Sequence, residues 1–202
     1  MAGIWSDERR QVLNGAYITF KSLSADGGLS FGDVGVLAVA MPLSWGGSVS
    51  EIDIDSLSYG TSDAKIGLSL FDNDPKVINL LQALKNVNKV IIVRTDEGGS
   101  KSTATLGGES PLTAVARYNG TAGNSIAVAI RVEGTSRVVE TYMSGRLKDT
   151  QVISTIDDLK DNEFVVFSGE GTPEATELTY LTGGINGTVG TPDVFGLLGL
   201  YE

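Results

Sequence analysis

The apolar positions in the first half of the chain form short runs and one helical stripe, which together indicate a small α/β domain. Residues 34–41 are almost continuously apolar, which is typical of a strand covered on both faces. Residues 90–93 form a second apolar run. Between the two runs, Asp74 can cap a helix with a proline in its first turn. One face of that helix carries an apolar stripe made of Val77, Ile78, Leu80, Leu81 and Leu84. Strand, helix and strand in this order predict an α/β domain over residues 28–95.

Beyond residue 110 the pattern consists of strands and turns. Six short segments at turn-punctuated spacing predict an antiparallel β-sandwich over residues 111–184. They lie near residues 112–117, 126–132, 137–143, 146–153, 163–167 and 178–181. Ser144-Gly145 favours a hairpin turn, and residues 156–159 favour at most one helical turn. Residues 96–110 are rich in Gly, Ser and Thr, which predicts a linker between the two domains.

The two ends of the chain fit neither domain. Residues 1–27 are predicted to be an extended N-terminal arm whose short strand has no local pairing partner; the strand consists of Ala16, Tyr17, Ile18, Thr19 and Phe20. Residues 185–202 carry apolar side chains with nothing after them to bury them, which indicates the start of a truncated third domain. The predicted fold class is therefore α+β and mainly β, with a small α/β domain, an antiparallel β-sandwich and an N-terminal arm.

Three separated segments carry a resemblance to a known family. Residues 117–132 join a Gly- and Asn-rich turn to a long strand. Residues 13–22 read Leu-Asn-Gly-Ala-Tyr-Ile-Thr-Phe-Lys-Ser, and residues 182–188 read Thr-Gly-Gly-Ile-Asn-Gly-Thr. In this order the segments resemble the N-terminal half of a contractile-tail sheath protein, of the type found in tailed phages and phage-tail-like particles of Gram-positive bacteria. The resemblance covers essentially the whole chain, and the family's subunits continue well beyond residue 202.

This resemblance implies a structural subunit that assembles as stacked rings around a tail tube. It implies contraction that drives the tube through a cell envelope, and an arm whose residues 16–20 pair with a neighbouring subunit. The implied partners are other copies of the sheath subunit, the tail tube protein, the baseplate and the tail terminator. The implied location is the tail of a virion or particle that is assembled in the bacterial host cytoplasm.

Composition disfavours several other classes of function. The chain has 15 basic and 25 acidic side chains and a net charge of −10, which disfavours binding to nucleic acid or to anionic membranes. It contains no Cys and no His, so a disulfide, a thiolate zinc site and a histidine base are all impossible within it. No apolar run approaches the length of a membrane span, and residues 1–20 lack the apolar core of a signal peptide. We therefore expect neither membrane insertion nor a signal peptide.

The candidate chemical motifs have simpler interpretations. Residues 98–102, Gly-Gly-Ser-Lys-Ser, depart from a phosphate-binding loop because Ser stands where Gly must precede Lys. The acidic clusters at residues 53–55 and 72–74 lack the Gly and Glu of an EF-hand loop, and indicate a solvated strand face and a helix cap. The glycosylation sequons at residues 119–121 and 186–188 are interpreted as turns. A Ser–Lys or paired-carboxylate mechanism stays open, but no spacing indicates one, so the sequence predicts no enzyme, cofactor site or metal site.

A carbohydrate-binding or adhesin β-sandwich is the alternative function. Such a protein would need exposed aromatic side chains clustered on one face of a sheet. The sandwich region contains Tyr118, Tyr142 and Tyr180, and their spacing does not predict that they lie together.

Overall fold

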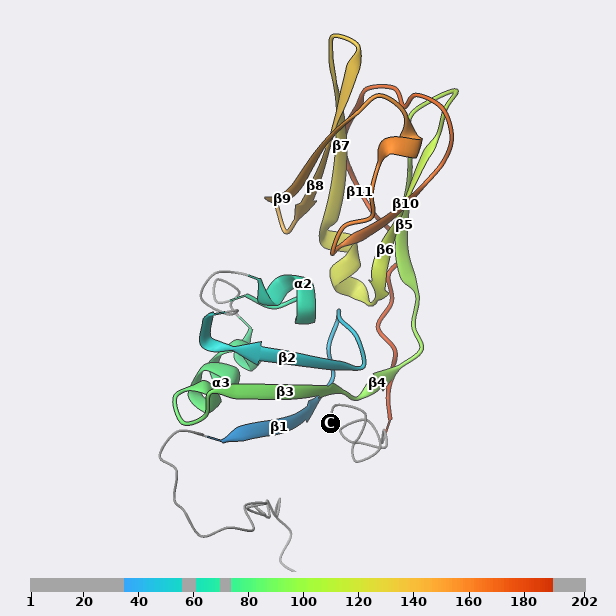
Figure 1. Cartoon of the computed structure of the whole chain (residues 1–202). Helices are drawn as coiled ribbons and strands as arrows, with labels where there is room; N and C mark the ends of the chain where they lie inside the picture. Colours follow the sequence, from blue (N-terminus) through green and yellow to red (C-terminus); the bar gives the residue numbers. More distant parts are fainter. Residues whose placement is uncertain (1–34, 56–60, 70–73, 191–202) are drawn as a thin grey trace, which may run out of the picture. The chain divides into compact units, whose positions relative to one another are not determined.

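A three-stranded sheet and a β-sandwich account for most of the structure, which is a computed structural model (Figure 1). The structure describes residues 35–55, 61–69 and 74–190. The predicted arm strand of Ala16, Tyr17, Ile18, Thr19 and Phe20 lies outside these residues, and so do residues 191–202. The prediction of a mainly β fold with a β-sandwich is confirmed.

The three-stranded sheet has the strand order β1-β3-β2. The strands β1 (Val36–Met41) and β3 (Lys89–Arg94) are parallel, and β2 (Val49–Asp53) is antiparallel to β3. Two helices, α2 (Ser62–Ile66) and α3 (Pro75–Leu84), lie between β2 and β3 in the sequence. The Asp74 carboxylate accepts the Lys76 amide at 2.8 Å, so this residue caps α3 as predicted.

A hydrophobic core joins α3 to one face of this sheet. It contains Leu43, Ile52, Ile66, Leu68, Val77, Leu80, Leu84, Val90 and Ile92. The prediction that residues 34–41 are covered on both faces is wrong for the strand that forms there. Leu37, Val39 and Met41 of β1 pack against the core, but the alternate residues, beginning with Val36, are exposed.

The β-sandwich consists of two antiparallel sheets with a shared core. One sheet has the order β10-β6-β5 and the other has the order β11-β7-β8-β9. The strands are β5 (Lys101–Leu106), β6 (Leu112–Asn119), β7 (Ile126–Glu133), β8 (Ser136–Met143), β9 (Arg146–Ile153), β10 (Val165–Ser168) and β11 (Thr176–Tyr180). Ser144 and Gly145 both have positive φ in the predicted hairpin turn, and η2 (Ile156–Asp158) is the predicted single helical turn.

Alternate residues of the sandwich strands point into the core, which explains the pattern found in the sequence. The β6 strand contributes Leu112, Ala114 and Ala116, and β7 contributes Ile126, Val128 and Ile130. These six side chains are buried. Full burial of one large aliphatic side chain stabilises a fold by about 1.5–3 kcal/mol, so the two facing sheets hold each other strongly.

The prediction that residues 96–110 form a linker is wrong. They contain β4 (Asp96–Glu97) and the whole of β5, which pairs with β6 in the sandwich. The expected start of a third domain also differs from the structure over residues 185–190. Ile185 pairs with Ser100, and β12 (Thr188–Val189) pairs with β4, so the chain returns alongside residues 95–100.

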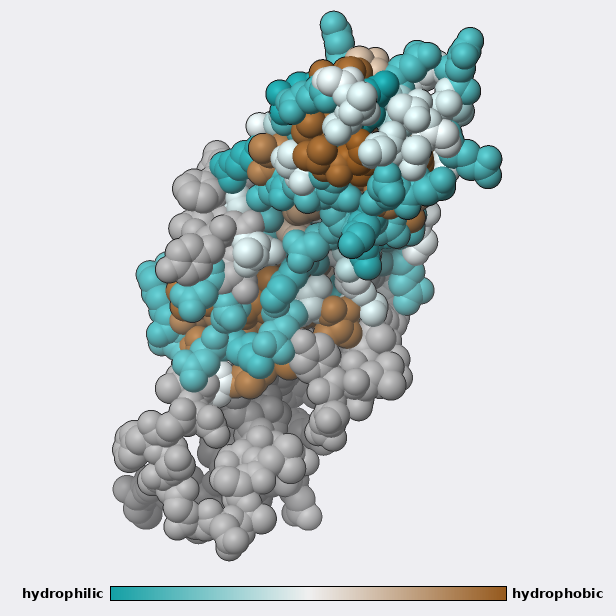
Figure 2. Space-filling view, turned by 45° about the horizontal axis from the view of Figure 1, so that its top comes forward, coloured by the Kyte–Doolittle hydropathy of each residue, from teal (hydrophilic) through white to brown (hydrophobic). Residues whose placement is uncertain are grey.

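The surface of the described residues is mixed in polarity. Figure 2 shows hydrophobic residues over both the sandwich and the three-stranded sheet, in areas bordered by hydrophilic residues. Within the described residues, no helix has the length and apolar character needed to cross a membrane.

Candidate functional site: the junction of the two sheet systems

Trp45 connects the three-stranded sheet to the sandwich. It lies in the loop between β1 and β2, yet its side chain is fully buried in the core of the sandwich. The indole ring meets Tyr118 edge-on with the ring centroids 5.2 Å apart, and stacks with Phe164 at 6.4 Å. Its Nε1 donates a hydrogen bond of 2.9 Å to the Ala64 carbonyl. One residue therefore contributes to both parts of the structure, and no local pattern in the sequence predicts it.

A buried ion pair lies beside this loop. Arg94, at the end of β3, donates from Nε and Nη2 to the Asp96 carboxylate at 2.9 and 2.5 Å. Its Nη1 donates to the carbonyl of Gly46 and to the Asn119 side chain, at 2.9 and 3.0 Å. Asp96 also accepts the Leu43 amide at 2.8 Å. The pair therefore joins the β1–β2 loop, the end of β3 and the end of β6.

The ionisation of Asp96 reflects this environment. Burial alone would raise the pKa of the carboxyl group. The hydrogen bonds from Arg94 and from the Leu43 amide, together with the positive charge of Arg94, outweigh burial and lower the pKa below its ordinary value of 3.8. The group is therefore a carboxylate at neutral pH, as an acceptor for Arg94 must be.

Two of the three segments that carry the family resemblance meet at this junction. Asn124, in η1 (Thr121–Ser125), accepts hydrogen bonds from the Ser102 hydroxyl and the Gly184 amide, both at 2.8 Å. Its amide nitrogen donates to the Gly184 carbonyl at 3.0 Å. The Asn186 side chain accepts the Thr121 amide at 2.8 Å. Residues 117–132 and 182–188 thus form one hydrogen-bonded knot.

The same contacts account for the motifs that were interpreted as turns. The side-chain nitrogen of Asn119 donates to the Gly98 carbonyl and its side-chain oxygen accepts from Arg94, so this sequon residue has a structural role. In the motif at residues 98–102, the Ser100 amide donates to the Ile185 carbonyl at 3.0 Å. That backbone is occupied by pairing and does not form a phosphate cradle. Among the described residues, no group of three acidic side chains could hold a metal ion.

Gly120 allows the knot to pack against the β1–β2 loop. Its φ is +129°, and a Cβ atom at this position would lie 2.0 Å from the Ser44 carbonyl oxygen. We expect Gly120→Ala to destabilise the protein by more than about 2 kcal/mol, because it adds a backbone clash to an unfavourable φ. Gly134→Ala is the matched control, since Gly134 also has positive φ but has no atom within 4 Å of the added Cβ. Equal midpoints of urea unfolding for the two variants would contradict this account.

A further contact joins the far side of the junction. Lys148 of β9 forms an ion pair with Asp63 of α2, and both side chains are largely buried. The hydroxyl of Ser69 accepts a long hydrogen bond of 3.5 Å from Arg146. The sandwich therefore contacts the three-stranded part through β9 as well as through Trp45 and Arg94.

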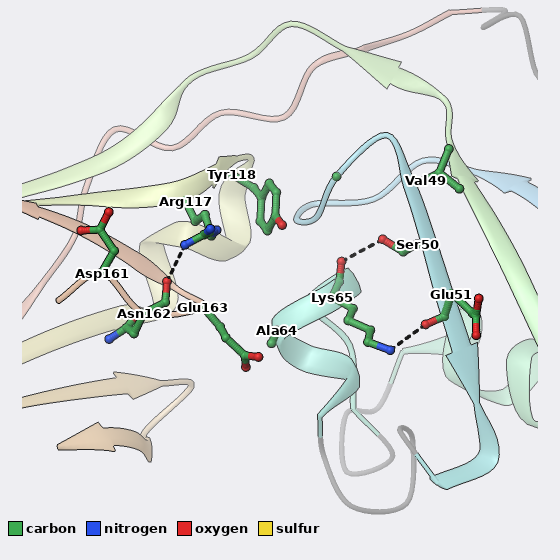
Figure 3. Close-up of a pocket in the computed structure, with 11 residues that line it drawn as sticks. Val49, Ser50, Glu51, Ala64, Lys65, Arg117, Tyr118, Asp161, Asn162 and Glu163 are labelled. Atoms are coloured by element: carbon green, nitrogen blue, oxygen red, sulfur yellow. Dashed lines mark hydrogen bonds between the residues drawn. The ribbon is translucent and has the colours of Figure 1, made fainter. Parts of the chain in front are cut away.

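A cleft of about 550 Å³ opens next to the junction (Figure 3). One wall comes from β2 and α2, where Lys65 donates to the Glu51 carbonyl at 3.0 Å. The other wall comes from β6 and residues 161–163, where Arg117 donates to the Asn162 carbonyl at 2.9 Å. The hydrogen bonds drawn in Figure 3 thus join residues of the same wall. The lining is a mixture of both charges and shows no nucleophile–base arrangement.

Two of the three tyrosines of the sandwich lie in one row of the same sheet. Tyr118 packs against Trp45 on one sheet. On the other sheet, Ala127 of β7 pairs with Tyr180 on one side and with Tyr142 on the other. These two tyrosines therefore share one row and one face, which corrects the expectation from their spacing.

The comparisons with known proteins concern this same part of the chain. The family described as the phage tail sheath protein beta-sandwich domain matches residues 97–186. This range covers β5 to β11 and the knot at residues 182–186. The structure of a sheath tail protein from Listeria innocua superposes with a TM-score of 0.66 at 30% identity, over 79% of this chain and 36% of that one. The structure of a sheath tail protein from Desulfitobacterium hafniense superposes with a TM-score of 0.68 at 28% identity, over 93% of this chain and 43% of that one.

Residues 97–186 of the chain therefore match the phage tail sheath family.

Two curated relatives come from Bacillus subtilis. The protein XkdK of the phage-like element PBSX is 30% identical over 177 residues, and the uncharacterised protein YqbK is 33% identical over 172 residues. These alignments cover 86% and 84% of this chain, but only 36% and 35% of the respective relatives. The chain thus spans about a third of the length of these relatives. The matched family is a structural one.

Proposed function

We propose that this chain forms part of a subunit of a contractile tail sheath, which assembles around a tail tube and contracts to drive the tube through a cell envelope. The match of residues 97–186 to the sheath sandwich carries the proposal, because these residues fold as the sandwich itself. The two similar sheath tail protein structures support it.

The junction suits a protein that works by moving as a solid body. A contracting lattice rearranges the contacts between subunits, and each subunit transmits that motion only if its own parts stay fixed. The Trp45 side chain, the Arg94–Asp96 pair and the knot around Asn124 are buried or hydrogen-bonded contacts of this kind. They hold the described residues together as one rigid part of the proposed subunit.

Electron microscopy of the full-length protein tests the proposal. We expect negatively stained preparations to contain hollow tubes or stacked rings, as the assembly of a sheath requires. A full-length protein that stays monomeric at high concentration, without tubes under any salt condition tried, would overturn the proposed function.

The finer partners follow from the same proposal. We infer that the subunit contacts other copies of itself, the tail tube protein, the baseplate and the tail terminator, in the tail of a virion or particle. We also infer that Ala16, Tyr17, Ile18, Thr19 and Phe20 pair with an open sheet edge of a neighbouring subunit. Such pairing supplies hydrogen bonds that an isolated strand in water lacks.

Replacing Ile18 with proline in the full-length protein tests the arm. Proline removes a main-chain donor and disfavours pairing in the middle of a strand. We expect the variant to fold with an unchanged thermal transition and to form no tubes by negative stain. Gln11→Pro, which lies before the proposed strand, is the control and is expected to assemble. Tubes of normal length from Ile18→Pro would show that the arm is not the link.

A further inference from the structure

The three-stranded sheet β1-β3-β2 is covered differently on its two faces. Ile66 of α2 and Leu80 of α3 lie in the same hydrophobic core as Val90 and Ile92 of β3. Both of these helices therefore cover one face of the sheet. Parallel strands, such as β1 and β3, are normally covered on both faces.

The opposite face is apolar and exposed along β1. Val36, Ala38 and Ala40 alternate with the residues of β1 that pack against the core, so they point to this opposite face. Val36 is 60% exposed, and both alanines are exposed. Ile91 of β3, which lies beside Ala38, is half-buried. We call these four residues the outer face: Val36, Ala38, Ala40 and Ile91.

The charges next to the outer face are already paired. Lys89 lies beside Val36 in the sheet and forms an ion pair of 2.6 Å with Glu51 of β2. The four residues of the outer face carry no charge themselves. A segment with an apolar side therefore covers this face without leaving a buried charge unpaired.

The chain returns to this sheet at residue 190. Val189 pairs with Asp96, and the Gly190 amide donates to the Thr95 carbonyl at 2.9 Å. The Thr95 amide in turn donates to the Met41 carbonyl at 3.1 Å, so the end of β1 occupies the adjacent position in the sheet. The residues after 190 must therefore leave the plane of the sheet. Because α2, α3 and their core fill one face, the outer face is the side left for these residues.

The sequence after residue 190 has the pattern of a helix with an apolar side. Thr191 is a suitable cap, and Pro192 suits the first turn. Apolar residues at positions i, i+3, i+4 and i+7 lie on one side of such a helix; they are Val194, Leu197, Leu198 and Tyr201. Gly196 and Gly199 lower the intrinsic helix propensity, so the helix depends on a surface against which it can pack.

We propose that residues 191–202 form a helix that packs on the outer face and runs antiparallel to β1, from Met41 toward Val36. A helix over residues 192–202 is about 16 Å long and β1 spans about 20 Å, so the two match in length. The sheet then has helices on both faces, and residues 191–202 complete this fold instead of starting the separate domain expected from the sequence. The inference does not rest on the proposed function, because it concerns how one chain completes its own fold.

Hydrogen exchange of the full-length protein, followed by mass spectrometry, tests the proposal. We expect the amides of residues 194–201 to be protected, and to exchange about 10-fold faster or more in Ala38→Glu, which places a carboxylate under the helix. Thr105→Glu adds the same charge to an exposed position of β5 and should leave this protection unchanged. Slow exchange of residues 89–94 shows that the sheet of each variant is intact. Unprotected residues 194–201 in the unaltered protein, or equal protection in a folded Ala38→Glu variant, would overturn the inference.

Disulfide cross-linking tests the position and direction of the helix, since residues 1–202 contain no Cys. We expect Ala40→Cys to form a disulfide with Val194→Cys, and Val36→Cys to form one with Tyr201→Cys. The exchanged pair, Val36→Cys with Val194→Cys, is the control, because the proposed direction holds these Cα atoms beyond the limit of about 7 Å. Cross-linked peptides are identified by mass spectrometry, and a non-reducing gel shows whether the disulfide lies within one chain. Equal cross-linking of the exchanged pair, no cross-link in the two expected pairs, or disulfides that join two copies would each contradict the proposal.

Discussion

Replacing Trp45 with alanine is expected to destabilise the protein by about 3–5 kcal/mol, the usual cost of removing a large buried aromatic side chain. The side chain is fully buried, and it packs against Tyr118 and Phe164. Its removal also leaves the Ala64 carbonyl without the indole donor. Because Trp45 links the β1–β2 loop to the sandwich core, the loss should loosen the junction as well as the core.

Urea unfolding followed by far-ultraviolet circular dichroism measures this effect. We expect a single transition in the unaltered protein and a strongly lowered midpoint in Trp45→Ala. Leu147→Ala is the control, because Leu147 is 52% exposed and its truncation should change the free energy of unfolding by less than about 0.5 kcal/mol. Similar midpoints for the two variants would mean that Trp45 does not hold the two parts together.

Local pattern was sufficient to predict most of the sandwich. In the strand around Val128, large core residues alternate with small or charged ones, and that alternation is visible in the sequence. The capped start of α3 at Asp74 is equally local, since the cap and the helix are consecutive residues. Features that depend on a few neighbouring residues could therefore be predicted from the sequence.

Two errors arose where tertiary contacts reverse the meaning of a local pattern. The strand β5 looks like a linker because it contains Ser102 and several Thr residues, but Ser102 is buried and its hydroxyl is satisfied by Asn124. The strand β1 looks like a strand covered on both faces, yet only the face that carries Leu37, Val39 and Met41 packs against the core. Which polar residues find partners, and which face of a strand is covered, depends on segments far away in the sequence.

Most of the candidate site could not be predicted from the sequence, for the same reason. Arg94 and Asp96 lie close in sequence, but their partners Leu43 and Asn119 do not. The row that joins Tyr142 to Tyr180 depends on the register of three strands, and a slip of one residue would put a strand's side chains on the other face. Only the family resemblance of residues 117–132 and 182–188 gave a signal, and those segments prove to be in contact.

Removing the Asp96 side chain is expected to cost about 3–5 kcal/mol, because it leaves the buried Arg94 guanidinium without its counter-charge. The side chains of the pair are only 4% and 2% exposed, so water cannot replace the carboxylate. Asp96→Ala also leaves the Leu43 amide without its acceptor. Lys89→Ala is the control: its ion pair with Glu51 is more exposed, and its loss should cost no more than about 1 kcal/mol.

The pH dependence of the free energy of unfolding distinguishes the contribution of the Asp96 charge from that of the shape and hydrogen bonds of its side chain. A carboxyl group whose pKa is lowered by folding contributes stability above its unfolded pKa, here about 3.8, and loses that contribution as the pH falls through the folded pKa. The free energy of unfolding of the unaltered protein should therefore exceed that of Asp96→Asn by the largest amount near neutral pH. On acidification below 3.8 this difference should shrink, because Asp96 then also becomes neutral. A difference that stays constant from neutral pH to about pH 2 would show that shape and hydrogen bonding, and not the charge paired with Arg94, hold the junction.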